Sequence, residues 1–564
     1  MLFASFDFLL FFAVTFSVYW ALVGRPRARL LWIVGSSYFF YMASSKPVDG
    51  PLPTPWYFVG LLILSTIVDF FCGQRIAAAR KRLPPDEPDG RAGKPWLLVA
   101  ILTNLGLLGY FKYAGFLLEV ARDICSVFGL APHLPVVHAL LPIGISFYTF
   151  QTLSYTIDVY RGKIKAEPSF LRFAFFVAFF PQLVAGPIVR ASEFLHQLHH
   201  RPKLTVDDVN EALWRISKGV VKKVVFGDFI AAVFSDQVFA SPATHSSLEN
   251  LMALYAFTLQ IYADFSGYSD IAIGVARLFH FRIPENFNRP YQAIDMADFW
   301  RRWHMTLSTW LRDYLYYPLG GSRVGETRTY INLGITMFLV GIWHGASWNF
   351  VIYASVQAGA MLFNRACRKL PPWSMARVLR IGSLTLLTTA ALALLGRLVL
   401  RIPDIWQFSL LGGAIALLIA LLPRADTRRW TLPLHIGLTI HFSILSRIFF
   451  RAEDLDAARE ISLKLIQWDG LGVREGLFRI PNLSAWLEAI PSLSFARPLA
   501  EWGIFFLLLV GFALHYTPAE RVNRTAIQWI SKTPAILLGV GLALIAGLLS
   551  ILLAGPRANI YFAF

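Results

Sequence analysis

The chain has 564 residues, of which 56% are hydrophobic and only 15% are charged, and its mean hydropathy is +0.53. Soluble domains are about one quarter charged, so this composition excludes an ordinary soluble protein and indicates a membrane protein. The formal net charge of +17 comes from basic residues in short loops beside apolar runs, a positive-inside pattern that does not fit a nucleic-acid-binding surface.

The predicted elements are apolar segments, compared with the roughly 20 residues that a helix needs to cross a bilayer. In chain order they are Leu2–Leu22, Leu30–Met42, Trp56–Cys72, Trp96–Leu118, Leu140–Val159, Phe170–Val189, Leu213–Phe239, Leu251–Phe265, Ile331–Trp343, Trp348–Phe363, Ile381–Leu400, Phe408–Leu422, Leu432–Phe450, Trp502–His515 and Ile536–Ala554. Several are short, so the number of true crossings stays open. The first lacks a basic region and a cleavage site, so we interpret it as a retained span rather than a signal peptide.

Basic loops give the predicted orientation. Arg25, Arg27 and Arg29 follow the first span, which places this loop in the cytoplasm and the N-terminus outside. The polar loop Gln74–Pro95 is assigned to the same side, and so is the basic segment Arg161–Lys165. The less charged segment 465–501 holds several prolines and is predicted to form an extracytoplasmic loop where a partner could dock.

The overall expectation is an all-α protein, a polytopic transmembrane helical bundle that forms a single membrane domain over residues 1–564. No repeat of fixed period and no soluble domain interrupts it. Three widely spaced cysteines (Cys72, Cys125 and Cys367) predict neither a disulfide framework nor a cysteine-based acyl relay.

Two polar segments lie inside apolar regions. Ser146–Gln151 has a polar and aromatic face, which could line a tunnel or form hydrogen bonds between helices. Pro181–Pro187 reads as a broken helix end, which is either a ligand site or a kink. Their chemistry alone does not separate these alternatives.

Asp264 and Asp270 flank Gly267 at the end of an apolar segment. Carboxylates inside a membrane are costly and are candidates for function. The glycine suggests a helix break here, so we favour a structural role in which the acids cap exposed backbone or pair with Arg277 or Arg282.

Three histidines, His196, His199 and His200, have a spacing that can bind a metal on a helix. The surrounding sequence is polar and loop-like, so we interpret them as a solvated cluster and predict no metal site.

Residues Met296–Tyr317 are predicted to form one amphipathic helix at the membrane interface or along a cavity wall. Aromatic and apolar residues recur at helical spacing, with arginines mostly on the other side. Asp295 is the expected N-cap. In a continuous helix His304 would share one strip with Trp300 and Ser308, which lie four residues away on either side.

Two histidines, His304 and His344, are the candidate catalytic residues. His344 follows an uncharged apolar segment and precedes a glycine, so its imidazole is expected where water is scarce. Burial disfavours the charged imidazole, and a neutral ring can accept a proton from an alcohol. Each histidine alone is as readily explained by a structural role, and His304 also by a position at the water interface. The pair, with tryptophans around it, favours function.

Around these histidines, the candidate substrate-binding residues are Trp300, Trp303, Ser308, Arg312, Trp343, Asn286, Gln151 and Asp264.

Six segments form long and specific motifs, namely Ser146–Arg161, Phe180–Pro187, Asp264–Asp270, Asn286–Tyr291, Phe299–Arg312 and Trp343–Gly345. In these motifs the chain resembles the membrane-bound O-acyltransferase (MBOAT) family, and within it the bacterial branch of alginate O-acetylases, peptidoglycan O-acetyltransferases and teichoic-acid D-alanyl transfer proteins. The resemblance is strongest over about residues 141–190 and 255–350. Gly320–Arg323 and the chain length resemble the alginate-acetylase type more than the teichoic-acid type.

The resemblance implies a many-helix fold with a central tunnel, a catalytic core within residues 141–350, His344 as the catalytic histidine and His304 as the second active-site histidine. It implies transfer of an acyl group, most simply acetyl, from a cytoplasmic thioester such as acetyl-CoA or an acyl carrier protein. The acceptor would be an extracytoplasmic polysaccharide, reached through an SGNH-type acetyltransferase partner, and the location the bacterial inner membrane. Alternatives are a transporter or export channel without chemistry, and an MBOAT acting on lipid, peptidoglycan, teichoic acid or protein.

Overall fold

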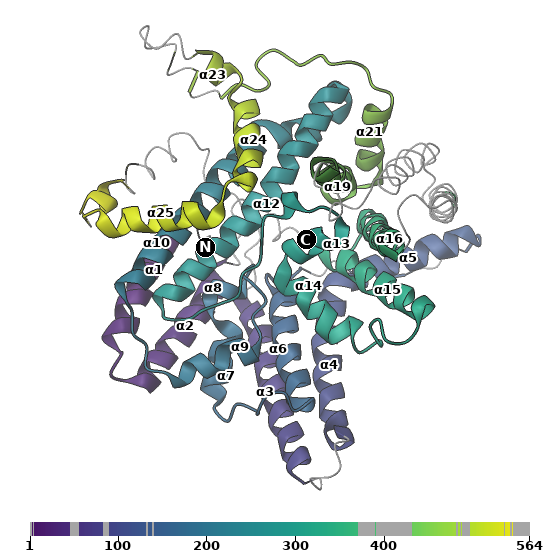
Figure 1. The fold of residues 1–564 in the computed structure, drawn as a ribbon. Helices are drawn as coiled ribbons and strands as arrows, with labels where there is room; N and C mark the ends of the chain where they lie inside the picture. The colour runs from purple at the N-terminus through teal and green to yellow at the C-terminus, as the bar shows by residue number, and fades with distance from the viewer. Residues whose placement is uncertain are drawn as a thin grey trace.

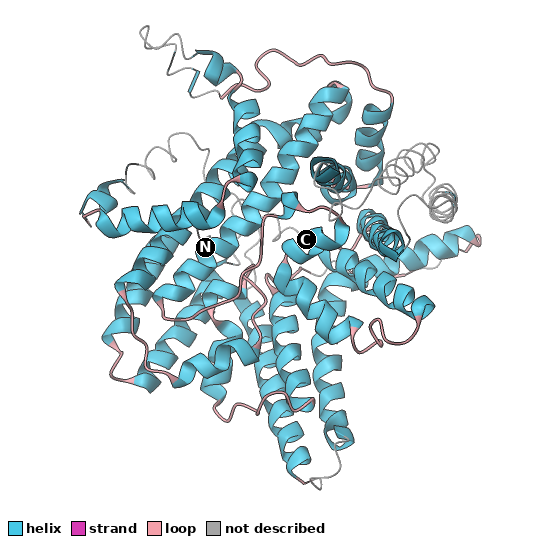
Figure 2. Cartoon of the chain, in the orientation of Figure 1, coloured by secondary structure: helices cyan, strands magenta, loops and turns pink. Residues whose placement is uncertain are grey.

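The computed structural model describes residues 5–44, 56–82, 90–130, 134–137, 140–369, 431–480, 497–534 and 536–541, with isolated residues outside these ranges. Within them every regular element is a helix and none is a strand (Figure 2), which confirms the all-α prediction. The predicted spans Ile381–Leu400 and Phe408–Leu422 and most of Ile536–Ala554 lie outside the described residues, as do about a third of the residues in the predicted loop 465–501.

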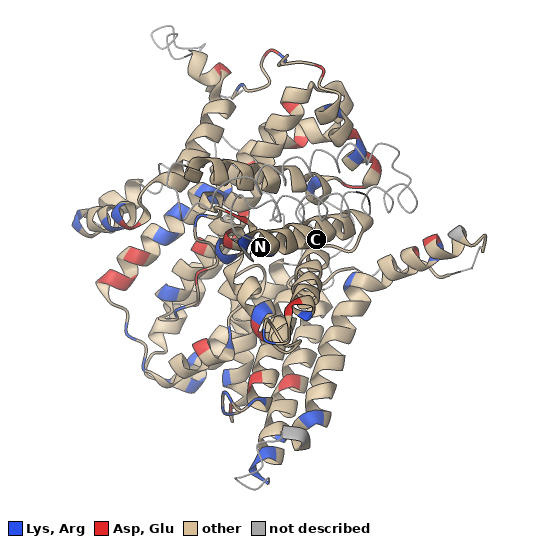
Figure 3. Ribbon diagram, turned by 45° about the vertical axis from the view of Figure 1, so that its right-hand side comes forward, with Lys and Arg blue, Asp and Glu red and all other residues tan. Residues whose placement is uncertain are grey.

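Among the described residues, three helices are long and apolar enough to cross a membrane, namely Trp56–Lys81, Lys94–Ser126 and Leu432–Arg451. A fourth is reached if Gly503–Tyr516 and Ala519–Lys532, bent by 100°, count as one broken span. The other predicted segments within the described residues form helices that are too short or too polar to cross a membrane on their own. Figure 3 shows long stretches of helix without charge, as the composition predicts.

Helices α3 (Val59–Lys81), α4 (Lys94–Leu108) and α6 (Ile145–Tyr160) lie side by side (Figure 1). A buried polar network joins them. Asn104 Nδ2 donates to Asp69 at 2.7 Å, and the Thr156 hydroxyl donates to the other carboxylate oxygen at 2.9 Å. Because buried polar groups need partners where water is absent, this network fixes how the three helices pack.

Helix α12 (Ser247–Leu278) runs through the middle of the molecule beside α10 (Val206–Val221) (Figure 1). The predicted helix break at Gly267 is wrong, because α12 continues through it. A Cβ at Gly267 would lie 2.7 Å from the backbone oxygen of Gly219 on α10. The glycine therefore allows a close approach of two helices.

The acids of α12 have partners other than those predicted. Asp264 pairs with Lys223 at 2.5 Å, and Asp270 is surrounded by three cations at 2.8–3.2 Å, Arg215, Lys218 and Lys222. Pairing of Asp264 or Asp270 with Arg277 or Arg282 is wrong, since Arg277 pairs with Asp208 and Glu211 on α10. The structural interpretation of these acids is supported.

On the other side of α12, α15 (Glu326–His344) and α16 (Trp348–Lys369) form a helical hairpin with the short connection Gly345–Ser347. Helices α19 (Leu432–Ser446), α20 (Ile448–Arg451) and α21 (Leu455–Ile466) pack near it (Figure 1). The helix end predicted at Pro181–Pro187 is observed, since the short α8 (Phe180–Leu183), which follows α7 (Phe170–Ala178), ends inside this segment.

Replacing Gly267 with alanine should destabilise the protein, because the new methyl group would press on the α10 backbone. Overpacking of this kind costs about 1–3 kcal/mol. Gly106→Ala on α4 is the matched control, since nothing lies within 4 Å of its Cβ position and alanine favours a helix. Thermal unfolding in detergent should show a lower midpoint for Gly267→Ala only; equal midpoints for Gly267→Ala and wild type would contradict the close-contact account.

Candidate active site

The predicted helix Met296–Tyr317 is not continuous. It divides into α13 (Met296–Arg302) and α14 (Met305–Leu311), followed by a π-helical turn over Arg312–Tyr316. His304 lies at the break with a φ of 42°, a left-handed conformation that a regular helix cannot contain. The expectation that His304 shares a strip with Trp300 and Ser308 is therefore wrong, whereas Asp295 is the N-cap as predicted.

The break is held by the segment that begins at Asn286. The backbone oxygen of Asn286 accepts from the Met305 N–H at 2.9 Å, and the Asn288 N–H donates to the Arg302 oxygen at 2.9 Å. The Asn286 side-chain oxygen accepts from the Thr306 hydroxyl at 2.8 Å and from the Thr306 N–H at 3.3 Å. These bonds satisfy backbone and side-chain groups at both new helix ends.

The same oxygen of Asn286 lies 3.0 Å from His304 Nδ1. Because the Thr306 N–H can only donate, the atom facing it is the amide oxygen, and His304 Nδ1 must carry a proton to bond it. In a neutral ring Nε2 is then an acceptor. His304 is fully buried, and its Nε2 makes no hydrogen bond to any described residue.

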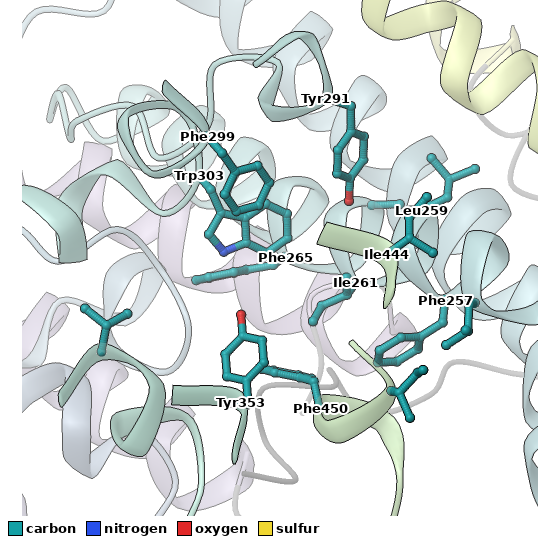
Figure 4. Close-up of a cluster of buried hydrophobic side chains, with 14 of the residues drawn as sticks. Phe257, Leu259, Ile261, Phe265, Tyr291, Phe299, Trp303, Tyr353, Ile444 and Phe450 are labelled. Atoms are coloured by element: carbon teal, nitrogen blue, oxygen red, sulfur yellow. The ribbon is translucent and has the colours of Figure 1, made fainter. Parts of the chain in front are cut away.

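His344 is the last residue of α15 and is 3% exposed. A Cβ on the following Gly345 would lie 2.1 Å from the Phe350 ring, so this turn requires glycine. The imidazole packs against Trp343, Phe450 and Tyr353, with ring centroids 5.0, 5.3 and 6.2 Å away. The latter two belong to the buried cluster in Figure 4.

The indole of Trp343 joins the two histidines. Its ring centroid is 5.0 Å from that of His344 and 5.6 Å from that of His304. Phe147 of α6 contacts both Trp343 and His304, at 5.7 and 6.3 Å. The structure thus brings together two histidines that are forty positions apart in the sequence.

A small pocket of about 30 Å³ opens beside His344, and Ser146 and Phe147 of α6 are among its lining residues. Such a space holds one or two water molecules, and so admits a hydroxyl group or a small acyl group. His344 is itself one of the residues that line the pocket. A tunnel across the molecule stays a prediction.

Lys112 lines the same pocket and was not among the predicted site residues. Its ammonium group donates to the backbone oxygens of Trp343 at 2.5 Å and His344 at 3.4 Å. It lies in a π-helical segment, Gly109–Tyr113, within an apolar helix, and such segments are frequent at functional sites. The sequence did contain a signal for Lys112, because a lysine in an otherwise apolar span is a candidate for a functional site.

The other predicted residues divide into two groups. Trp300, Trp303 and Asn286 are buried close to His304 in the chain or in space. The second group has partners elsewhere in the protein. Gln151 and Ser308 donate to the backbone oxygens of Phe176 and Trp303, and Asp264 and Arg312 form ion pairs with Lys223 and Asp313. None of these four residues lines the His344 pocket. A substrate-binding role for these four residues stays a prediction.

Among the described residues, no group of three or more His, Cys, Asp or Glu side chains could hold a metal ion. His196, His199 and His200 are exposed, and His196 Nδ1 bonds the Ser192 oxygen at 3.1 Å. The candidate site therefore rests on imidazoles, a lysine and aromatic walls.

Comparisons with known proteins place the chain in a family. Residues 149–376 match the model of the membrane-bound O-acyltransferase family. The chain is 42% identical over 371 residues to "Probable alginate O-acetylase AlgI" of Pseudomonas aeruginosa, covering 65% of this chain and 66% of the relative. It is 41% identical to the protein of that name from Azotobacter vinelandii, covering 65% and 69%. The chain belongs to the membrane-bound O-acyltransferase family.

A third relative of this MBOAT protein is "Peptidoglycan O-acetyltransferase" of Helicobacter pylori, 35% identical with coverage of 61% of this chain and 65% of the relative. The chain thus spans about two thirds of the length of the curated relatives it matches. The family match includes both histidines and Trp343, and it confirms the predicted family. Together with the apolar helices it identifies a membrane protein.

Replacing Lys112 with methionine should lower kcat by about tenfold or more with little change in KM, because the end of α15 that carries His344 loses a charged hydrogen-bond donor. Lys112→Arg should restore part of the activity. Lys94→Met, on the exposed first turn of the same apolar stretch, is the matched control. Thioester turnover by purified protein is the measurement, and an unchanged kcat in Lys112→Met would contradict the positioning role.

Proposed function

We propose that this MBOAT protein transfers an acetyl group from a cytoplasmic thioester, such as acetyl-CoA or an acyl carrier protein, for O-acetylation of an extracytoplasmic polysaccharide such as alginate. The observation that carries the proposal is the pair of buried histidines joined by Trp343 beside a small pocket. The volume of that pocket favours acetyl over a long acyl chain. The names of the curated relatives support the polysaccharide acceptor.

In the proposed reaction the acceptor hydroxyl attacks the thioester carbonyl while an imidazole takes its proton. The new C–O bond forms, the C–S bond breaks, and the proton passes to the leaving thiolate, so the imidazole returns neutral. His344 takes this base role because it faces the pocket. A positioned base accelerates such a step by about 10²–10⁴-fold.

His304 supports the transfer from the other side of Trp343. Its Nδ1 donates to Asn286, so a neutral His304 offers an acceptor at Nε2. This favours a hydrogen bond from a neighbouring hydroxyl group of the acceptor, because the hydrogen of the attacking hydroxyl passes to His344. A role in binding the developing oxyanion would need a proton on Nε2 as well, and hence a buried imidazolium, which is costly without a counter-charge.

The acetyl group would leave the membrane through a partner. We infer a multi-pass location in the bacterial inner membrane and a separate SGNH-type acetyltransferase on the outer face, which would receive the group and modify the polymer. No described globular segment of this chain is large enough to hold a long glycan, which supports such a relay.

His344→Ala should reduce release of thiol from labelled acetyl-thioester by at least about 10²-fold, because the general base is lost. His304→Ala should reduce the release of thiol by a similar factor. His199→Ala, an exposed histidine outside the site, serves as the control and should keep wild-type turnover. A His344→Ala protein that purifies normally and turns over thioester at the wild-type rate would overturn the assignment, whereas binding or flux of the thioester without release would favour a transporter.

Deleting the SGNH-type partner in cells should abolish polymer acetylation but leave thioester turnover by the purified membrane protein intact, because the two steps reside in different proteins. Product analysis by mass spectrometry names the acceptor. Direct acetylation of glycan by the purified MBOAT protein alone would contradict the relay. Acetylated lipid, peptidoglycan or teichoic acid as the main product would replace the polysaccharide acceptor proposed here.

A further inference from the structure

A second and larger cavity, of about 560 Å³, is separate from the site of His304 and His344. Its walls come from the start of α2 (Pro26–Ser44), the start of α7, the segment around His200 and the residues that follow α12. Its lining shares no residue with the His344 pocket. The volume is in the range of small-molecule binding sites.

The polar part of the lining is cationic. Arg27, Arg29 and Arg172 contribute guanidinium groups and His200 and His280 contribute imidazoles, and no Asp or Glu is among the lining residues. Of the three arginines, Arg172 is paired with Glu167 at 2.8 Å, so its charge is already balanced. The excess positive charge of the cavity therefore rests on Arg27 and Arg29.

Arg29 packs against an aromatic ring, but one of its hydrogen-bond donors has no acceptor among the described residues. Its guanidinium lies over the Tyr19 ring, 5.3 Å from the centroid. Its Nη1 is buried and has no hydrogen-bond partner among the described residues. A buried charged donor left without an acceptor is costly, and a bound phosphate oxygen would remove this cost, since guanidinium groups bind phosphate in a bidentate manner.

The other part of the lining is apolar and is open at one edge. Phe175, Phe281 and Ile33 are buried in it, whereas Leu31 is 61% exposed. Leu31 lies on α2, one turn beyond Arg27, in a segment that the sequence predicts to be a membrane span. The cationic end of the cavity belongs to the basic loop expected at the cytoplasmic face, where the leaflet is rich in anionic lipid.

We propose that this cavity binds the headgroup of an anionic phospholipid. Arg27 and Arg29 hold the phosphate oxygens, and an acyl chain leaves along Leu31 toward the bilayer. A soluble phosphate compound would meet the same arginines but would gain nothing from the open apolar edge. The proposal does not depend on the acyl-transfer chemistry.

Native mass spectrometry of the full chain in detergent, titrated with phosphatidylglycerol or phosphatidylcholine, tests this site. Phosphatidylcholine has the same phosphate, but its own cation faces a cationic cavity, so the wild type should retain phosphatidylglycerol preferentially. The Arg27→Ala, Arg29→Ala double variant should bind it about tenfold more weakly, because charge-assisted hydrogen bonds are lost. Arg29→Lys should keep part of the affinity.

Arg25→Ala is the matched control, because it removes the same charge from the same loop but does not line the cavity. Arg27 is exposed, so Arg27→Ala alone tests the site if the double variant does not fold. Equal retention of the two lipids, or an equal loss in Arg25→Ala, would overturn the proposal. Arginine-dependent binding of inorganic pyrophosphate that phosphatidylglycerol cannot displace would assign the cavity to a soluble phosphate compound and would also overturn it.

Discussion

The hydrogen bonds of Asn286 are the constraint on which the candidate site depends. One side-chain oxygen accepts from His304 and twice from Thr306, and the Asn286 backbone accepts from Met305. A left-handed residue that is not glycine costs free energy of order 1 kcal/mol, and these bonds offset that cost. Without them the α13 and α14 segments would follow their sequence pattern and join into one helix. His304 would then leave the Trp343 ring.

The second constraint is that buried charges need partners of opposite sign. The acids of α12 find these partners on α10 and on the segment that follows it. Asp264 and Asp270 of α12 each have a cation within 3.2 Å, from α10 or from the π-helical segment Lys222–Phe229 that follows it. The absence of Cβ atoms at Gly219 and Gly267 lets the backbones of α10 and α12 approach closely. This packing extends to the site, because Lys222 lies over the Tyr262 ring at 5.3 Å and Tyr262 contacts Trp303 at 6.4 Å. The ion pairs of α12 are therefore connected, through Lys222 and Tyr262, to the aromatic side chains around His304.

The sequence was sufficient for the helix class and the family, because composition, the length of apolar segments and long motifs can be read directly from it. The catalytic role of the two histidines stays a prediction. It was insufficient for the break at His304, since a single left-handed residue leaves the spacing of Trp300, Leu307 and Trp310 looking helical. Gly267 was misread because a glycine in an apolar segment fits a helix break and a close contact equally well. Pairing of Asp270 with Arg215 required knowledge of which helices are neighbours, and residue types alone do not contain it.

Lys112 shows why an intramembrane cation can be part of a site without touching a substrate. The carbonyls at the end of α15 carry the negative end of its helix dipole, and no further turn satisfies them. A lysine supplied from α4 and its π-helical extension satisfies these carbonyls and fixes the residue that carries the candidate catalytic imidazole. Gly345 places a second constraint on His344. A side chain at position 345 would collide with Phe350, so only glycine allows the backbone to turn directly after His344 and return into α16.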